Sequence, residues 1–182
     1  MSGIKGLVIL TRFDFIEEQF GRERLKKFID AIDIPQKNPL IQPIGISKEY
    51  KEIYLKTIDE LMLKEFFDDD TNNFLKLGHW NAKHLMPRYF QVYVENKQPG
   101  KFLQQMVVMR PLLIGLGDMK ISEVDNHRYY IYINYGQPFL ESVLLSERGF
   151  LEEGCRMCGA NKVRSKDITS NDISIEYELS WS

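Results

Sequence analysis

The last segment of the chain alternates strictly between apolar and polar residues. From Ile173 to Trp181, apolar or aromatic side chains occupy every second position, and serines and glutamates lie between them. A period of two with β-branched and aromatic residues is typical of a β-strand that has one buried face. No other stretch has so clear a period. We therefore expect this segment to be the last strand of an antiparallel sheet.

The last third of the chain predicts the other strands of this sheet. Strands are expected at 119–124, 128–135 and 162–169, and a helix is expected at 146–158. The order is strand, strand, helix, strand, strand. In strand 128–135 both alternating sets of side chains are largely apolar or aromatic, which is typical of a strand with two covered faces. The prediction is an α+β fold whose four-stranded antiparallel sheet is covered by helices on both faces.

The first 116 residues are predicted to be mostly helical, because their apolar side chains recur at helical spacing. The segment 7–10 could either open the first helix or form a short strand. Ser47 is the expected N-cap of a later helix. The other expected elements are a helix at 22–32, a loop from Pro35 to Gly45, a helix at 47–66, a helical stretch at 71–95 interrupted at Pro87, and a helix at 99–109 that Pro111 ends or kinks. We expect one domain over residues 1–182, with a helical part at 1–116 and a sheet-containing part at 117–182.

The charge balance argues against nucleic-acid binding. The chain has 24 basic and 26 acidic residues, whereas nucleic-acid-binding domains usually have a basic excess on one face. No apolar run is long enough for a signal peptide or for a membrane span. Two cysteines do not make a disulfide framework. These features predict a cytoplasmic protein.

No motif in the sequence predicts catalysis or metal binding. His79 and His84 are five residues apart, not the four that place two metal ligands on one helical face. No serine or cysteine lies in a recognisable nucleophile motif. The acidic run from Asp68 to Asp70 could bind a metal, but adjacent carboxylates without further ligands are usually solvated. We expect no enzyme activity, no metal and no catalytic residues.

Cys155 and Cys158 form the one pair whose spacing suggests chemistry. A Cys-x-x-Cys pair can be redox-active or half of a zinc site. The sequence has no second pair of zinc ligands at suitable spacing, and the expected position at the end of a helix opposes a thiolate. Both cysteines align with Leu144 and Leu151 on a helical wheel, which favours buried structural cysteines.

Several short segments resemble a known superfamily. The opening residues 3–8, with Phe20-Gly21 after them, are similar to the start of haem-nitric oxide/oxygen-binding domains. The segment from Gly149 to Gly154, with Cys155 to Cys158 and the final hairpin after it, resembles the end of 4-vinyl reductase-like ligand-binding domains. The order of elements also resembles that of Bet3-like trafficking subunits. The chain is most similar to an uncharacterised, haem-free bacterial paralogous family of about this length.

The same resemblance implies haem binding in some members, and this sequence departs from their pattern. Those members hold the haem propionates with a Tyr-x-Ser-x-Arg motif on the second strand, and the matching positions here are Tyr132, Asn134 and Gly136. Their proximal histidine lies on the helix before the sheet, and the corresponding segment here has none. Met106 and Met109 could offer thioethers, but methionines at helical spacing usually fill a core. We therefore expect no haem or other cofactor.

The resemblance and the two-faced strand together predict a sensor or regulatory domain that binds a small apolar ligand between helices and sheet. The alternative is an interaction or dimerisation module whose interior is filled. A homodimer or a signalling-protein partner fits either prediction. The expected ligand-binding residues combine apolar walls with a few polar groups; they are Met106, Met109, Arg110, Tyr130, Tyr132 and Asn134.

Overall fold

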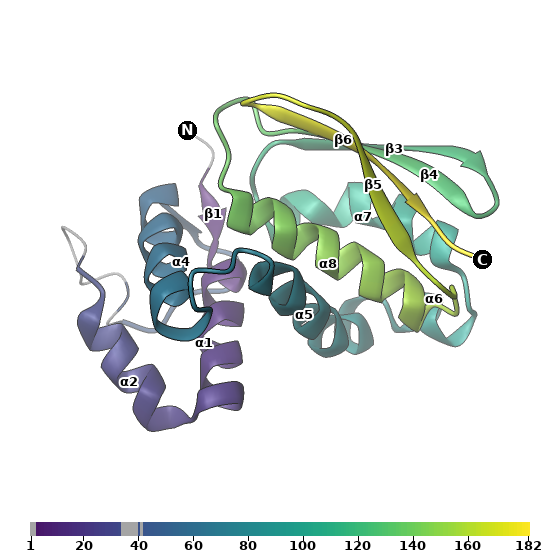
Figure 1. Cartoon of the computed structure of the whole chain (residues 1–182). Helices are drawn as coiled ribbons and strands as arrows, with labels where there is room; N and C mark the ends of the chain where they lie inside the picture. The colour runs from purple at the N-terminus through teal and green to yellow at the C-terminus, as the bar shows by residue number, and fades with distance from the viewer. Residues whose placement is uncertain (1–2, 34–39, 41) are drawn as a thin grey trace. The chain divides into compact units, whose positions relative to one another are not determined.

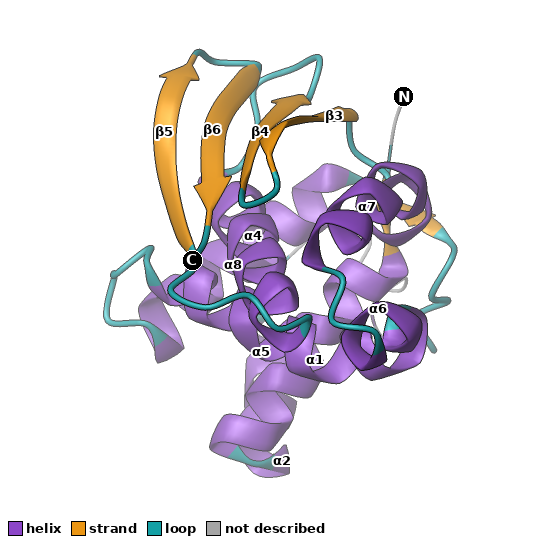
Figure 2. Cartoon of the chain, turned by 90° about the vertical axis from the view of Figure 1, so that its right-hand side faces the viewer, coloured by secondary structure: helices purple, strands orange, loops and turns teal. Residues whose placement is uncertain are grey.

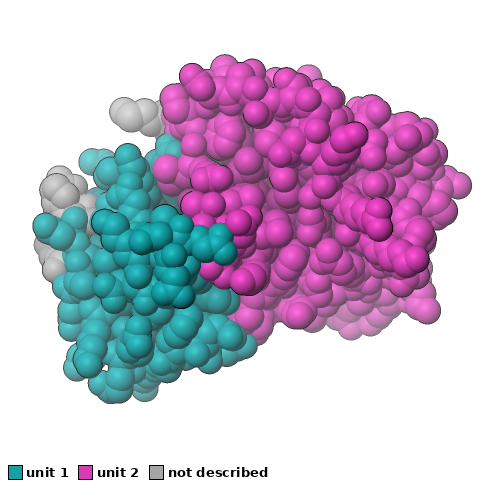
Figure 3. Space-filling view, viewed as in Figure 1, with its two compact units in different colours: residues 1–70, 112–116 teal, residues 71–111, 117–182 magenta. Residues whose placement is uncertain are grey.

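The computed structural model describes residues 3–33, 40 and 42–182, and it divides into two compact units (Figures 1 and 3). Unit 1 comprises residues 1–70 and 112–116, and unit 2 comprises residues 71–111 and 117–182. The chain passes from unit 1 back to unit 2 between residues 116 and 117, which is also the predicted boundary between the helical part and the sheet-containing part. That the whole chain acts as a single domain stays a prediction. The predicted loop at 35–45 lies partly outside the described residues.

The described elements of unit 1 are mainly helical. They are β1 (Ile4–Lys5), α1 (Gly6–Phe20), α2 (Arg22–Ala31), β2 (Glu49–Tyr50) and α4 (Glu52–Phe66). The segment 7–10 is therefore helical. The predicted N-cap at Ser47 is wrong, because Glu49 and Tyr50 pair with β1 and the helix begins only at Glu52. The interior contains a buried ion pair, in which Arg12 Nε lies 3.0 Å from Asp59 Oδ1.

Four helices form the helical part of unit 2. They are α5 (Asn73–Tyr89), α6 (Gln91–Glu95), α7 (Pro99–Leu113, whose last two residues belong to unit 1) and α8 (Glu141–Met157). The predicted interruption at Pro87 is wrong, because α5 continues to Tyr89. A proline inside a helix removes one hydrogen bond. Here the neighbouring Leu85 and Met86 are buried, and their packing holds the last turn in place.

Helices α5 and α8 approach each other closely through two glycines. A Cβ at Gly78 would lie 2.1 Å from the carbonyl oxygen of Ser146, and one at Gly149 would lie 2.2 Å from that of Leu75. Both distances are far below van der Waals contact, so a side chain at either position would push the helices apart. The resemblance segment that begins at Gly149 therefore contains a residue that this packing requires.

The sheet of unit 2 confirms the predicted strand order along the chain. Its strands are β3 (Asp118–Asp125), β4 (Arg128–Asn134), β5 (Arg164–Ser170) and β6 (Ser174–Ser180). They pair antiparallel in the order β3-β4-β6-β5, so the two hairpins join through β4 and β6. The pairing is irregular between Glu123 and Asp125 in β3 and between Asp167 and Thr169 in β5.

The prediction that helices cover both faces of the sheet is wrong. The inner face is buried, as Ile131 and Tyr177, which pair across β4 and β6, show. On the outer face, Tyr130 is 36% exposed and Tyr132 is half-buried. Helices α7 and α8 lie on the same side of the sheet (Figures 1 and 2). Tyrosine misleads the sequence pattern because its ring can lie flat on a surface while its hydroxyl contacts water.

Candidate functional site

A buried ion pair lies beneath the inner face of the sheet and joins α7 to α8. Arg110 and Glu147 are 1% and 4% exposed. The guanidinium donates two hydrogen bonds to the carboxylate, from Nε to Oε1 at 2.5 Å and from Nη2 to Oε2 at 3.2 Å. This parallel geometry is the strongest that arginine and a carboxylate adopt.

Two further groups complete this network. The hydroxyl of Tyr135, just after β4, donates to Glu147 Oε2 at 3.2 Å, and Arg110 Nη1 donates to the carbonyl oxygen of Gly117 at 2.8 Å. Gly117 has a φ of 61°, and a Cβ there would lie 2.3 Å from the carbonyl oxygen of Asn134. The glycine therefore allows the backbone to come close enough to accept this bond.

The network raises the pKa values of Arg110 and Tyr135. Burial by itself lowers the pKa of Arg110, but the charge of Glu147 and the hydrogen bonds to it outweigh burial, so the pKa is raised. Burial and the same carboxylate raise the pKa of Tyr135 well above its usual value. At neutral pH the site holds a guanidinium and a neutral phenol. Because these groups bond to one another, the arrangement is suited to holding α7, α8 and the end of β4 together.

The six predicted ligand-binding residues fall into two separate sets. The first set lies on α7, where Met106 and Arg110 are buried and Met109 is half-buried. This helix packs against the inner face of β4, because a Cβ at Gly100 would lie 2.3 Å from the hydroxyl oxygen of Tyr129. The β4 candidates lie on the opposite, outer face of the sheet, and they are Tyr130, Tyr132 and Asn134. Unit 2 therefore does not bring the six residues around one space.

Arg110, one of the predicted ligand-binding residues, is buried and donates its hydrogen bonds to the carboxylate of Glu147. Asn134 also has an internal role, because its Oδ1 accepts a hydrogen bond from the backbone N–H of Gly136 at 2.9 Å. Gly136 has a φ of 69°, so the segment that matches the propionate-binding motif forms a glycine-containing turn.

The residues of unit 2 do not fit a haem held as the resemblance implies. Helix α7 is the helix before the sheet, and it contains no histidine. His79 and His84 lie on α5, and His127 lies in the turn between β3 and β4. Within the described part of the chain, no three histidine, cysteine or acidic side chains gather so as to hold a metal ion.

A second polar cluster lies between α5, α8 and β5. Glu152 accepts hydrogen bonds from the hydroxyl of Ser165 at 2.6 Å and from Arg156 at 3.4 Å, and its Oε2 lies 3.1 Å from His79 Nε2. The serine and the histidine both contact the carboxylate rather than each other. The cluster thus lacks the nucleophile-to-base contact of a catalytic triad.

The two cysteines are buried, as predicted. Cys155 lies in the last turn of α8, Cys158 follows the helix, and both are 0% exposed. Burial raises the pKa of the Cys155 thiol well above its usual value and that of Cys158 to about 12. These thiols are therefore structural groups at neutral pH.

The sequence analysis missed Glu147, although the sequence contained a signal for it. Glu147 lies at helical spacing between Leu144 and Leu151, which are both buried. A carboxylate within an apolar helical stripe requires a buried partner. The identity of that partner had no local signal, because Arg110 lies 37 residues away.

Comparison of the whole structure with solved structures identifies the fold. An oxygen-binding H-NOX domain related to soluble guanylate cyclases superposes with a TM-score of 0.74 at 10% identity, covering 98% of this chain and 95% of that one. The Fe(II) unliganded H-NOX protein from K. algicida gives 0.72 at 11% identity, covering 98% and 96%. A structure from work on H-NOX activation gives 0.73 at 9% identity, covering 100% and 97%. No protein-family model and no curated protein matches the sequence. The chain therefore has an H-NOX-like fold.

Proposed function

We propose that this chain, whose fold is H-NOX-like, is a non-catalytic regulatory or sensor domain that works without haem. The observation that carries the proposal is the absence of histidine from α7. The ion pair between Arg110 and Glu147 supports the proposal, because the one buried cation of α7 is paired with a carboxylate of the protein and not with a haem propionate. Among the described residues, no helix is long and apolar enough to cross a bilayer.

Haem reconstitution tests the haem-free state. Purified protein is mixed with one equivalent of haem, desalted, and measured by absorption spectroscopy under reducing and oxidising conditions. We expect no Soret band above that of a non-binding control protein, while a haem-binding H-NOX domain treated in parallel retains one. A Soret band at stoichiometric intensity would overturn the proposal.

The proposal includes a small, largely apolar ligand in place of haem. Met106 and Met109 on α7 are the predicted lining residues that supply apolar contact, and methionine adapts readily to irregular ligands. Met109 is the more accessible of the two, since it is half-buried. Native mass spectrometry of the freshly purified protein should show an added mass that is lost on denaturation. Protein that is consistently empty would count against this ligand.

The alternative function is an interaction or dimerisation module. The observation that favours it is the packing of unit 2, where the rings of Phe90, Phe102 and Phe150 lie 5.3–6.3 Å apart beside the buried Met106. Sedimentation velocity separates the two functions when combined with the mass spectrum. A ligand-free dimer at micromolar concentration would favour the module, whereas a monomer that carries a ligand would favour the sensor.

A further inference from the structure

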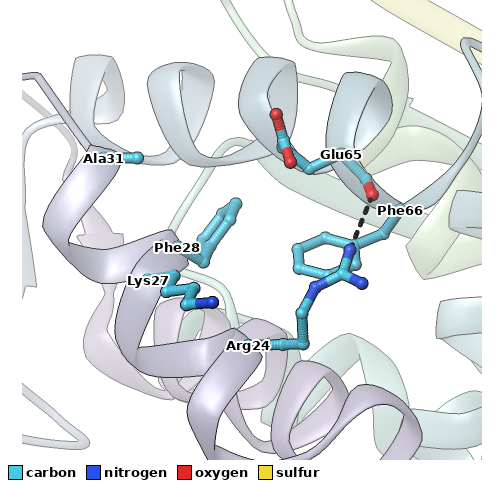
Figure 4. A pocket seen from close by; sticks show the side chains of 6 residues that line it. All are labelled: Arg24, Lys27, Phe28, Ala31, Glu65 and Phe66. Carbon is cyan, nitrogen blue, oxygen red and sulfur yellow. Dashed lines mark hydrogen bonds between the residues drawn. The ribbon is translucent and has the colours of Figure 1, made fainter.

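Unit 1 has an open groove between α2 and the end of α4 (Figure 4). Its volume is about 430 Å³, which falls in the range of small-molecule sites. The lining residues are Arg24, Lys27, Phe28, Ala31, Glu65 and Phe66. The groove lies wholly within unit 1 and involves none of the residues used in the proposed function.

Aromatic rings form the apolar part of this groove. Phe28 is buried, Phe66 is half-buried, and their ring centroids are 5.5 Å apart. The ring of Phe20, which is 38% exposed, lies 4.6 Å from that of Phe66. Of the two phenylalanines that line the groove, the half-buried Phe66 is the one whose ring is partly exposed, and it can pack against the apolar body of a ligand.

Two cations lie beside these rings. Arg24 and Lys27 are three residues apart and therefore share one face of α2. Figure 4 shows both side chains extending toward the space beside Phe28 and Phe66. The guanidinium of Arg24 stacks 5.2 Å above the Phe66 ring. This stacking holds the planar fork in place and exposes its donors.

Neither cation is neutralised within the described part of the chain. Arg24 donates one long hydrogen bond of 3.5 Å, to the backbone oxygen of Glu65, and no acidic side chain there lies within ion-pair distance of Lys27. The carboxylate of Glu65 points away from both cations in Figure 4. The groove therefore combines aromatic lining with two exposed cations, against the one carboxylate of Glu65.

We propose that this groove binds a small amphiphilic carboxylate, with its apolar or aromatic body on Phe28 and Phe66. The carboxylate is received by Arg24, whose fork suits two parallel hydrogen bonds, and by the ammonium of Lys27. Because both cations are exposed, each contributes modestly, and the affinity lies in the millimolar range.

The test is a titration of ¹⁵N-labelled protein with 3-phenylpropionate, followed by NMR. We expect shifts confined to α2 and the last turns of α4. The neutral amide of the same compound should bind more weakly. Lys27→Gln should raise the dissociation constant about two- to fivefold, as expected for an exposed ion pair. Lys26→Gln is the matched control, since it removes the same charge from an exposed residue of α2 that does not line the groove.

Three outcomes would overturn the proposal. The first is no saturable shift at α2 and α4, and the second is equal binding of the amide. The third is an equal effect of Lys26→Gln and Lys27→Gln, which would indicate general attraction rather than a site. Shifts at Met106 and Met109 alone would support the ligand of the proposed function and would still overturn the groove.

Discussion

Arg110 on α7 and Glu147 on α8 form a bidentate ion pair that water does not reach, with Nε and Oε1 2.5 Å apart. Each charge has lost its hydration, so its stability depends on the other. Tyr135 and the backbone of Gly117 satisfy further hydrogen-bonding sites of the pair. The pair therefore couples two helices and the end of β4 into one structural network.

Removal of one partner of this pair should destabilise the protein strongly. Arg110→Met leaves the Glu147 carboxylate buried without its cation, and we expect a loss of about 3–5 kcal/mol in the free energy of unfolding, measured by urea denaturation. Lys56→Gln is the control, because it breaks an exposed pair with Glu60 and should cost less than about 1 kcal/mol. The double variant Arg110→Met/Glu147→Leu should recover part of the loss. A double variant as unstable as the single one would contradict this account.

Loss of the hydroxyl should have different effects on stability at two buried tyrosines, Tyr135 and Tyr177. Tyr135→Phe removes a hydrogen bond to a carboxylate, and we expect it to cost about 1.5–3 kcal/mol. Tyr177 is fully buried, and its hydroxyl has no hydrogen-bond partner among the described residues. Tyr177→Phe should therefore be neutral or stabilising. Thermal unfolding of both variants checks the prediction, and equal losses would contradict it.

Glu152 should contribute a pH-dependent part of the stability. Burial alone raises the pKa of this carboxyl, but hydrogen bonds from His79 and Ser165 and the nearby positive charges outweigh burial and lower it below 4.5. A group whose pKa is lower in the folded state stabilises the protein above its unfolded pKa and loses that effect as the pH falls through the folded value.

Comparison with Glu152→Gln isolates this effect. The stability difference between the two proteins should shrink as the pH falls below about 4.5, measured by urea denaturation at each pH. Glu60→Gln, which removes an exposed carboxylate, is the matched control. A difference that does not change between pH 7 and pH 3 would show that the charge of Glu152 is not what stabilises the cluster.

The two cysteines should be unreactive in the native protein. With its pKa raised to about 12, roughly one Cys158 thiol in 10,000 is ionised at pH 8, and the pKa of Cys155 is raised well above its usual value. We expect no reaction with a thiol-specific disulfide reagent at pH 8 until denaturant is added, when two thiols per chain should react. Rapid reaction of one thiol in the native state would point instead to a functional cysteine.

The strands were predictable because a period of two needs only local information. Ile175, Tyr177 and Leu179 alternate with polar residues, and all three are buried as that pattern requires. The sequence pattern did not predict that the outer face of the sheet is exposed. Tyr130 and Tyr132 count as aromatic in a sequence pattern, yet a tyrosine is stable at a surface, and only the packed structure distinguishes the two cases.

The sequence predicted the buried cysteines but not the ion-pair network. Arg110 was predicted to bind a ligand, but its partner is Glu147 on another helix, and only the tertiary structure brings the two together. The groove of unit 1 was missed for the same reason. Arg24 and Lys27 read as an ordinary charged helix face until α4 places Phe66 beside them.

The irregular pairing in β3 and β5 has a consequence for self-association. Both strands lie at the edges of the sheet, where unpaired backbone groups would otherwise accept another strand. Each carries an irregularity and exposed charged residues, among them Lys120 and Lys166. A strand of a second molecule could pair with β3 or β5 only if the edge strand lost its irregularity and its exposed charges were buried. Any dimer of this protein is therefore expected not to form by pairing of these two edge strands.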